Sequence, residues 1–431
     1  MMDKRPLNWC KCNLKEIFST ASGGTPSRKE ASYYNGQIPW LKSGELNDNI
    51  VKKAEEFITK EGLDNSSAKI FPKGSILLAL YGATVGKIGK LDFEAATNQA
   101  ICCIYPSKFF NMNLLFYYLL FQKKFLISQG KGGAQPNISQ DIVKNLELFL
   151  PPLEEQGRIV EKIEELFSDI DNGIKDLKTA QAQIKQYRQS VLKSAFEGKL
   201  YKTSEWKEVK LEDVCQINPK TEIKDMKDDD IVSFLPMTSV KAECNYYTEE
   251  NVLYSKVKKG YTKFKNGDVL FAKITPCMEN GKVCIVDNLI QDIGFGSTEF
   301  HILRCLNNII PKYVYYVVIQ QCFRKKAKKN MVGAVGQQRV PADFMKNFDI
   351  PLPSLPEQQQ IVAEMEKRFL VADELEKAVN EGLLQAEKLK QSILKQAFAG
   401  KLVPQNPNDE PAAVLLERIK VAKENSTKGK K

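Results

Sequence analysis

The sequence contains fragments of nucleotide-binding and catalytic motifs, but none of them is complete. The segment "YGATVGKIG" has three residues between Gly82 and Gly86, where a phosphate-binding loop has four, and Ile88 stands where that loop needs a hydroxyl group for a metal ion. A methyltransferase that acts on adenine amino groups needs a polar residue, two prolines and an aromatic residue in a row. The adjacent prolines Pro151 and Pro152 lack both of these neighbours. We therefore expect no catalytic site in this chain.

Histidine and cysteine chemistry is also restricted. The single histidine, His301, lies in the apolar run "STEFHILRC", which is typical of a core or edge-strand residue. One histidine disfavours zinc hydrolases and histidine-dependent nucleophilic catalysis. The ten cysteines have neither metal-ligand nor disulfide-framework spacing. We expect reduced structural thiols, no metal site and no cofactor bound by this chain.

The composition is that of a globular protein with two or more domains. The chain has 431 residues, of which 43% are hydrophobic. The opening "MMDKRPLNWC" lacks the apolar segment of a signal peptide, and no apolar run is long enough to cross a membrane, so we predict a cytoplasmic protein. The net charge is +10, and residues 13–149 and 201–349 carry +4 each. This distribution suits contact with a polyanion.

The elements that position the candidate binding residues occur twice in the chain. "SAFEGKL" ends at Leu200 and "QAFAGKL" ends at Leu402, an offset of 202 residues. At this offset residues 150–200 align without a gap on residues 352–402, and 21 of the 51 positions are identical. Such an internal repeat indicates that one structural unit has been duplicated.

Each repeat predicts one long helix with a narrow apolar stripe. Gly198 and Gly400 stand where a left-handed residue ends a helix, and prolines with acidic residues stand at the starts. Each helix should span about 40 residues, or roughly 60 Å, and the pair should form a coiled coil. The first stripe is Ile159, Ile163, Leu166, Ile170, Ile174, Leu177, Ile184, Tyr187, Val191 and Ala195. The second is Ile361, Met365, Phe369, Ala372, Leu375, Val379, Leu383, Ala386, Leu389, Ile393 and Ala397.

The regions before the two helices resemble each other more loosely. "FPKGSILLAL" matches "FKNGDVLFAK", and "GKIG" matches "GKVC", which predicts strand-turn-strand hairpins that could present Lys87 and Lys282 to a ligand. Helical patterns follow around residues 113–127 and 312–329. We predict an α/β (α+β) fold class with a pseudo-twofold internal repeat. Its parts are two similar α+β domains, residues 1–149 and 201–349, two repeat helices, residues 150–200 and 350–402, and a short C-terminal helix and tail, residues 403–431.

Several long segments resemble the specificity (S) subunits of type I restriction-modification systems. The first half of such a subunit is similar to "QIPWLKSGELND", "GATVGKIG", "TNQAI" and "LPPLEEQGRIVEKIEELF". The second half is similar to "GYTKFKNGDVLFAKITPCMENGK", "GFGSTEFHILR", "LPSLPEQQQIV" and "AFAGKLVPQNPNDEPAAVLLERI". The similarity covers essentially the whole chain.

The resemblance implies a function and a set of partners. The two α+β domains would be target recognition domains, each reading one half of a split asymmetric site in double-stranded DNA, and two antiparallel helices would set the distance between the halves. The subunit would not be catalytic. Two modification subunits, which bind S-adenosylmethionine and methylate adenine, would dock on the helices. Two restriction subunits that use ATP and Mg²⁺ could join them.

Within that interpretation the sequence offers candidate DNA contacts. The loops "GKGGAQPNIS" (residues 130–139) and "MVGAVGQQRV" (residues 331–340) combine glycines, which permit close backbone approach, with amide and arginine side chains that can bond base edges. "FRKKAKKN" (residues 323–330) suits either phosphate contacts or a solvated helix face. The predicted DNA-binding residues are Lys42, Ser43, Lys87, Gln135, Asn137, Lys273, Lys282, Arg324, Lys325, Gln337, Gln338 and Arg339.

Three alternatives stay open at this point. The chain could be a specificity subunit that serves modification alone or recombines with other copies. It could be a coiled-coil adaptor that binds only proteins, which would show no salt-dependent DNA binding. It could also be an enzyme with an unrecognised site, which the missing motifs disfavour. The bases recognised do not follow from the sequence, because base readout depends on side-chain geometry and DNA shape.

Overall fold

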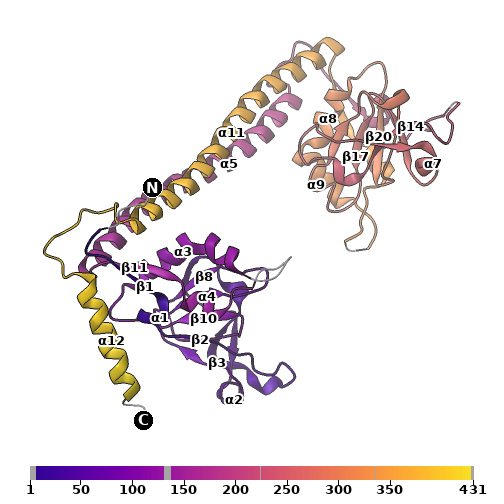
Figure 1. Ribbon diagram of the computed structural model, residues 1–431. Helices are drawn as coiled ribbons and strands as arrows, with labels where there is room; N and C mark the ends of the chain where they lie inside the picture. Colours follow the sequence, from indigo (N-terminus) through magenta and orange to yellow (C-terminus); the bar gives the residue numbers. More distant parts are fainter. Residues whose placement is uncertain (1–5, 131–136, 224, 335, 429–431) are drawn as a thin grey trace. The chain divides into compact units, whose positions relative to one another are not determined.

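The computed structural model describes residues 6–130, 137–223, 225–334 and 336–428. The chain divides into unit 1, Met1–Asp176 with Gly382–Lys431, and unit 2, Leu177–Glu381. Each unit contains part of both long helices, α5 (Leu153–Phe196) and α11 (Leu355–Phe398) (Figure 1). Both helices are 44 residues long, close to the predicted length. No helix in the described ranges is long and apolar enough to span a membrane.

Unit 1 contains three sheets, with strand orders β2-β10-β7-β8-β4, β5-β3-β9-β6 and β1-β11. The strands are β1 (Cys10–Asn13), β2 (Thr20–Ser22), β3 (Tyr34–Leu41), β4 (Asn49–Val51), β5 (Glu56–Ile58), β6 (Ile70–Phe71), β7 (Ile76–Ala79), β8 (Ile88–Leu91), β9 (Ala95–Thr97), β10 (Ile101–Ile104) and β11 (Glu147–Leu150). The helices are α1 (Leu14–Ile17), α2 (Lys60–Asp64), α3 (Met112–Gln129), α4 (Gln140–Lys144) and α12 (Ala412–Lys428), with short 3₁₀ turns η1 (Ala31–Tyr33) and η2 (Ser43–Glu45).

Unit 2 has the sheets β13-β20-β17-β18, β15-β14-β19-β16 and β12-β21. Its strands are β12 (Lys207–Lys210), β13 (Cys215–Ile217), β14 (Ile231–Leu235), β15 (Glu250–Leu253), β16 (Thr262–Lys265), β17 (Val269–Ala272), β18 (Val283–Ile285), β19 (Ile293–Gly296), β20 (Phe300–Cys305) and β21 (Asp349–Leu352). Its helices are α6 (Leu211–Val214), α7 (Tyr254–Val257), α8 (Pro311–Ile319), α9 (Gln321–Lys329) and α10 (Ala342–Lys346), with η3 (Met237–Ser239) and η4 (Ile290–Asp292).

The two units share one topology. When the strands of each unit are matched in chain order, each strand of unit 2 has the same neighbours as its counterpart in unit 1. The exception is β4, an additional strand of unit 1 that pairs with β8. The sheets β5-β3-β9-β6 and β15-β14-β19-β16 each contain one parallel pair, β3 with β9 and β14 with β19, at equivalent positions. The predicted similarity of the two globular regions is therefore confirmed, although few of their residues are identical.

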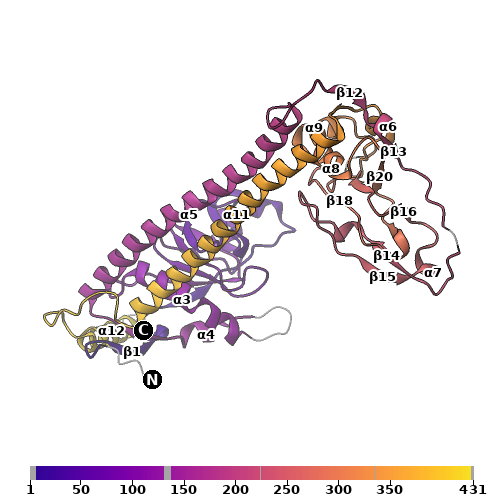
Figure 2. The ribbon, with the colours of Figure 1, turned by 90° about the horizontal axis from the view of Figure 1, so that it is seen from above.

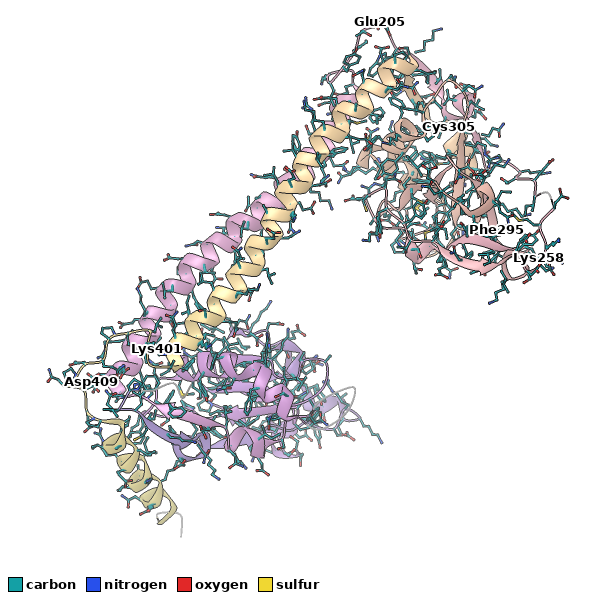
Figure 3. The ribbon with its side chains drawn as sticks, turned by 45° about the horizontal axis from the view of Figure 1, so that its top comes forward. Glu205, Lys258, Phe295, Cys305, Lys401 and Asp409 are labelled. Carbon is teal, nitrogen blue, oxygen red and sulfur yellow. The ribbon has the colours of Figure 1, made fainter. Side chains whose placement is uncertain are left out.

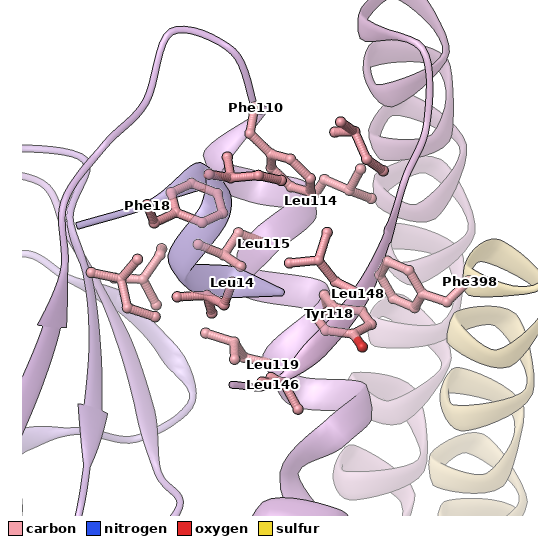
Figure 4. Packing of buried hydrophobic residues seen from close by; sticks show 14 of the residues in the cluster. Leu14, Phe18, Phe110, Leu114, Leu115, Tyr118, Leu119, Leu146, Leu148 and Phe398 are labelled. Atoms are coloured by element: carbon pink, nitrogen blue, oxygen red, sulfur yellow. The ribbon is translucent and has the colours of Figure 1, made fainter. Parts of the chain in front are cut away.

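Strand alternation explains why the central strands are buried on both faces. In β7, Ile76 and Leu78 belong to the core that contains α3, whereas Leu77 and Ala79 belong to the core beneath the second sheet. The residues of β17 divide between two cores in the same way. Figure 4 shows the first of these cores, in which Leu14 and Phe18 meet Leu115 and Leu119 of α3, with Phe398 of α11 at one side.

The repeated helices enter the cores through equivalent residues, which explains why their ends are the best conserved parts of the repeat. In unit 1 the helix residues that become buried are Ile159, Val160 and Ile163 from α5 with Ile393, Leu394 and Ala397 from α11. In unit 2 they are the residues 202 positions away, namely Ile361, Val362 and Met365 from α11 with Val191, Leu192 and Ala195 from α5. The start of one helix thus lies beside the end of the other in each unit, so the helices are antiparallel there (Figure 2).

The predicted apolar stripes are correct along most of each helix but wrong at three positions. Tyr187, Leu375 and Leu389 are exposed to 43%, 53% and 52%. A seam that alternates steps of four and three runs from Ala372 to position 376 and then to Val379, so it passes beside Leu375. The prediction failed because it preferred apolar residues over residues at the correct helical phase.

Charged residues occupy the seam positions next to these exposed apolar residues. Arg188 of α5 pairs with Asp373 and Glu376 of α11 in unit 2. Lys390 of α11 pairs with Asp171 of α5 in unit 1, and its side chain is only 19% exposed. Ion pairs therefore join the two long helices in both units, at seam positions that alternate with apolar residues.

Two shorter predicted helices are confirmed in part. The pattern at residues 113–127 lies inside α3, but the pattern at residues 312–329 forms two helices, because Gln320 has an extended backbone (φ −58°, ψ 141°) that separates α8 from α9. The C-terminal helix α12 packs on the core of unit 1. Asp409, which is labelled in Figure 3, lies before α12 and pairs with Arg158 near the start of α5.

Candidate nucleic-acid interface

The last residues of the first glycine-containing loop lie beside the end of β7, an inner strand of the sheet β2-β10-β7-β8-β4 in unit 1. The backbone N–H of Ile138 donates to the carbonyl of Leu80 at 2.8 Å, and the N–H of Leu80 donates to the carbonyl of Ala100 at 2.8 Å. Asn137, the residue before Ile138, is exposed. The candidate Gln135 falls within residues 131–136, outside the described residues.

The second loop joins unit 2 through the same backbone bonds. The N–H of Val340 donates to the carbonyl of Lys273 at 2.9 Å, and the N–H of Lys273 donates to the carbonyl of Glu299 at 2.9 Å. The predicted equivalence of the two loops is therefore confirmed at their ends. It also makes Arg339 the counterpart of Asn137, because each residue directly precedes the anchored one.

The backbone of the second loop is held at several points. Val332 and Arg339 exchange two backbone hydrogen bonds of 3.0 and 2.9 Å, and the N–H of Thr275 donates to the carbonyl of Gln338 at 3.0 Å. Gln337 is exposed and Gln338 is half-buried. The loop thus presents its side chains from a fixed hairpin.

His301 supports this loop from within the sheet. Its Nε2 lies 2.8 Å from the carbonyl of Val340, so Nε2–H donates there and Nδ1 can accept from the side-chain amide of Asn218 at 3.0 Å. Burial lowers the pKa of His301 below its ordinary value, in keeping with a neutral ring. Of the predicted alternatives, a core or an edge-strand residue, the structure confirms the core, because His301 is buried in β20 between β13 and β17.

Arg339 is the one predicted contact that forms a bidentate ion pair in the described loop. Its Nε lies 2.9 Å from Oε2 of Glu299, and its Nη2 lies 2.8 Å from Oε1. Its Nη1 donates to the carbonyl of Gln337 at 2.9 Å. Hydrogen bonding by Arg339 lowers the pKa of Glu299, while burial lowers the pKa of the neighbouring Lys273. Glu299 was missed in the sequence because the partner residues are 40 positions apart.

Lys87 and Lys282 also occupy equivalent positions. The carbonyls of both accept a bond from the last residue of β7 or β17, and the preceding glycines Gly86 and Gly281 have positive φ values of 76° and 71°. The predicted hairpins are therefore present. Lys87 Nζ donates to Oδ1 of Asn47 at 3.0 Å, and Lys282 Nζ donates to the carbonyl of Met237 at 2.8 Å. Each lysine amine is thus bonded to the turn that follows a strand of the adjoining sheet, β3 in unit 1 and β14 in unit 2.

Lys42 and Ser43 lie at the end of β3. Lys42 Nζ lies 2.6 Å from Glu56, which raises the pKa of Lys42, and Glu56 is also paired with Arg28. Ser43 begins η2 and is half-buried. Lys42 is thus neutralised by a local carboxylate, which weakens the case for a phosphate contact in the unbound protein.

The basic segment of α9 separates into two kinds of residue. Arg324 is only 7% exposed, and its guanidinium donates to the carbonyls of Ile319 and Glu279 and to the carboxylate of Glu243. This burial argues against the prediction that Arg324 contacts DNA, since its donors already hold three segments of unit 2 together. Lys325, the next residue of the helix, is exposed.

A family comparison identifies the protein family that contains these two equivalent units. The family model for the type I restriction modification DNA specificity domain matches residues 6–179 and 203–385, which lie on both globular regions and both long helices. The chain belongs to this specificity family. No group of three or more histidine, cysteine, aspartate or glutamate residues suited to a metal ion occurs in the described part of this specificity chain.

Individual specificity subunits match over different lengths. The EcoAI specificity subunit of Escherichia coli is 35% identical over 257 residues, which are 50% of this chain and 43% of that protein, so the chain aligns with less than half of it. The StySPI specificity subunit of Salmonella potsdam is 24% identical, and the match covers 97% of this chain and 96% of that one. The match therefore spans nearly the whole of the second relative.

Solved structures share the fold of this specificity chain. One, from work on the assembly and conformational transition of the type I R-M system, has a TM-score of 0.71 at 19% identity and covers 92% of this chain and 99% of its own. The HsdS subunit from Thermoanaerobacter tengcongensis has a TM-score of 0.51 at 20% identity, with 92% and 98% covered. At these identities the likeness concerns the fold. It agrees with the predicted fold class of two α+β domains and long antiparallel helices.

Proposed function

We propose that this chain is the DNA sequence-recognition subunit of a type I restriction-modification complex. Its two units would each read one half of a bipartite, asymmetric site in double-stranded DNA. The observation that carries this proposal is the match of the specificity family to both units, in which Ile138 and Val340 are bonded at equivalent positions of equivalent sheets.

The difference between the two loops supports an asymmetric site. Asn137 and Arg339 occupy equivalent backbone positions, and so do Ala100 and Glu299. Side chains of unlike hydrogen-bonding capacity at one position of a shared frame would select unlike bases. Exposed lysines such as Lys325 would add affinity through phosphates without adding sequence information.

The helix α11 supports docking of partner subunits. Several of its large apolar side chains are at least half exposed, and exposed apolar residues that gather on one element mark sites of protein interaction. They are Leu370, Val371 and Leu375 in unit 2 and Leu384 and Leu389 in unit 1. We assign this surface to two modification subunits, which would bring S-adenosylmethionine and adenine methylation. Restriction subunits, where present, would bring the ATP- and Mg²⁺-dependent activity, and the complex would act in the cytoplasm.

The proposal is tested with the chain co-purified with its modification subunits. Footprinting across a salt series should give two protected segments separated by an unprotected spacer, and protection should weaken steeply as salt rises. Sequencing of methylated plasmid DNA should give one bipartite site with an adenine modified in each half. A single uninterrupted footprint, methylation by the isolated chain, or the absence of salt-dependent DNA binding would overturn the proposal. The last result would favour the protein-binding adaptor.

A further inference from the structure

We infer that Arg339 reads a guanine in the half-site of unit 2 and that Glu299 is the positioning residue that fixes its guanidinium for this contact. The inference rests on the proposed function and makes it specific, because it assigns one base type to one unit. It also assigns a role to Glu299, a carboxylate that would otherwise be unfavourable near a DNA surface.

The hydrogen-bond inventory of Arg339 supports a guanine contact. A guanidinium carries five N–H donors. Three are engaged, one at Nε and one at Nη2 by Glu299, and one at Nη1 by the carbonyl of Gln337. One hydrogen on each terminal nitrogen then lacks an acceptor among the described residues. Two donors at neighbouring nitrogens match the O6 and N7 acceptors of guanine in the major groove, which is the commonest base contact of arginine.

The carboxylate is less accessible to solvent than the arginine that it holds. The side chain of Glu299 is 23% exposed, whereas that of Arg339 is 43% exposed. Lys273 lies beside both charges, because its backbone is bonded to Glu299 and to Val340, the residue after Arg339. Burial lowers the pKa of Lys273, Glu299 raises it and Arg339 lowers it. Two cations against one carboxylate leave the cluster positive, so DNA can approach the arginine without meeting an uncompensated negative charge.

Backbone hydrogen bonds hold the segments that carry Arg339 and Glu299 in place. The backbone N–H and carbonyl of Arg339 are both hydrogen-bonded to Val332. The next residue, Val340, is hydrogen-bonded to Lys273 and to the ring of His301. Glu299 immediately precedes β20, whose first residue, Phe300, pairs with β17. Fixing the side chain before binding reduces the entropy lost when the contact forms.

Unit 1 provides a natural comparison for the cluster. At the positions of Lys273, Glu299 and Arg339 it has Leu80, Ala100 and Asn137, joined by the same backbone bonds. The frame therefore tolerates a small apolar residue at the position of Glu299. A Glu299→Ala variant should fold, so that any effect on recognition reflects the orientation of Arg339.

The test uses the complex with modification subunits and a plasmid library in which every position of the half-site read by unit 2 is randomised. Methylation is scored by sequencing for the wild type, Glu299→Ala, Glu299→Gln, Arg339→Lys and the double variant Glu299→Ala/Arg339→Lys. We expect one guanine whose preference falls about tenfold in each single variant, with the other half-site unchanged. Arg339→Lys keeps the charge but removes the planar fork. The double variant should lose no more than Arg339→Lys, because Glu299 acts through Arg339.

The matched control is Glu279→Gln. This carboxylate also pairs with a cation of unit 2, Lys328 of α9. It should leave every base preference unchanged. The inference is overturned if the affected base is not a guanine, if both half-sites weaken equally, or if the double variant loses the product of the single losses. A wild-type complex that methylates no bipartite site overturns the proposed function, whereas a bipartite site unaffected by Glu299→Ala overturns this inference alone.

Discussion

The carboxylates of Glu155 and Glu357 hold the same position in the two units, and each accepts a hydrogen bond from a tryptophan indole. The donor is Trp9 at 3.0 Å in unit 1 and Trp206 at 3.5 Å in unit 2. Both carboxylates are nearly inaccessible, with exposures of 0% and 3%. These contacts explain why the motif "LPxLxEQ" occurs twice. In each unit its glutamate joins the start of one long helix to the segment that follows the end of the other long helix.

The number of donors differs between the two carboxylates, and the pKa shifts follow it. Glu357 accepts from backbone and hydroxyl groups of Thr203 and Ser204, and these hydrogen bonds, first that of the Ser204 hydroxyl, hold its pKa far below the usual range. Glu155 accepts from Gln405 and Trp9 only in the described structure, and burial raises its pKa.

We therefore predict opposite effects for Glu357→Gln and Glu155→Gln. Glu357 stabilises the fold above the ordinary glutamate pKa of about 4.3, and this contribution is lost as pH falls through its lowered pKa. Glu357→Gln should thus destabilise unit 2 most at pH 7 and less in acid. Glu155 is penalised when ionised, so Glu155→Gln should leave stability equal or higher at pH 7, and that advantage should vanish as pH falls. Denaturant unfolding at several pH values measures both, and equal losses at pH 7 would refute the assignment.

Replacing Arg339 with alanine should affect only one half of the recognition site. Because each unit carries its own loop frame, the loss should be confined to the half-site read by unit 2, about 5- to 150-fold for a bidentate base contact. Methylation kinetics on sites mutated in one half at a time measure it. A loss shared equally by both halves would mean that Arg339 supports folding or assembly.

Lys325→Ala and Arg324→Ala should separate phosphate contact from structural support. Replacing the exposed Lys325 with alanine should weaken DNA binding by a similar factor for all sequences and reduce the salt slope by about 1. Arg324→Ala removes a buried guanidinium that bonds Glu243, so it should lower the unfolding temperature of unit 2. The two measurements are binding across a salt series and thermal unfolding. An unchanged slope in Lys325→Ala would remove α9 from the interface.

Lengthening the helix pair should lengthen the DNA spacer. Duplicating Thr179–Ala182 in α5 together with residues 378–381 in α11 keeps the insertions level, because Gln181 and Asn380 are bonded at 3.2 Å. Four residues add about 6 Å, close to two base pairs at about 3.4 Å each. The apolar phase shifts by only about 40°. Methylation mapping should give the same half-sites with a longer spacer, and an unchanged spacer would show that the helices do not set the distance.

The sequence alone determined the repeated architecture. The offset of 202 residues identified two copies of one unit, the apolar periodicity gave two helices of nearly the observed length, and glycines such as Gly86 and Gly281 marked the hairpins. These features are visible because helical phase, turn conformation and duplication depend on residues close together in the chain or at one fixed spacing.

The tertiary structure decided which side chains remain available. It buried Arg324, which the sequence had grouped with exposed lysines, and it placed Arg188, Glu376 and Lys390 in a seam that composition had assigned to apolar residues. It also brought Glu299 to Arg339. The physical reason is common to these cases: strand pairing, loop docking and helix pairing join positions from 40 to 219 residues apart, and the burial and charge state of each side chain depend on those remote neighbours.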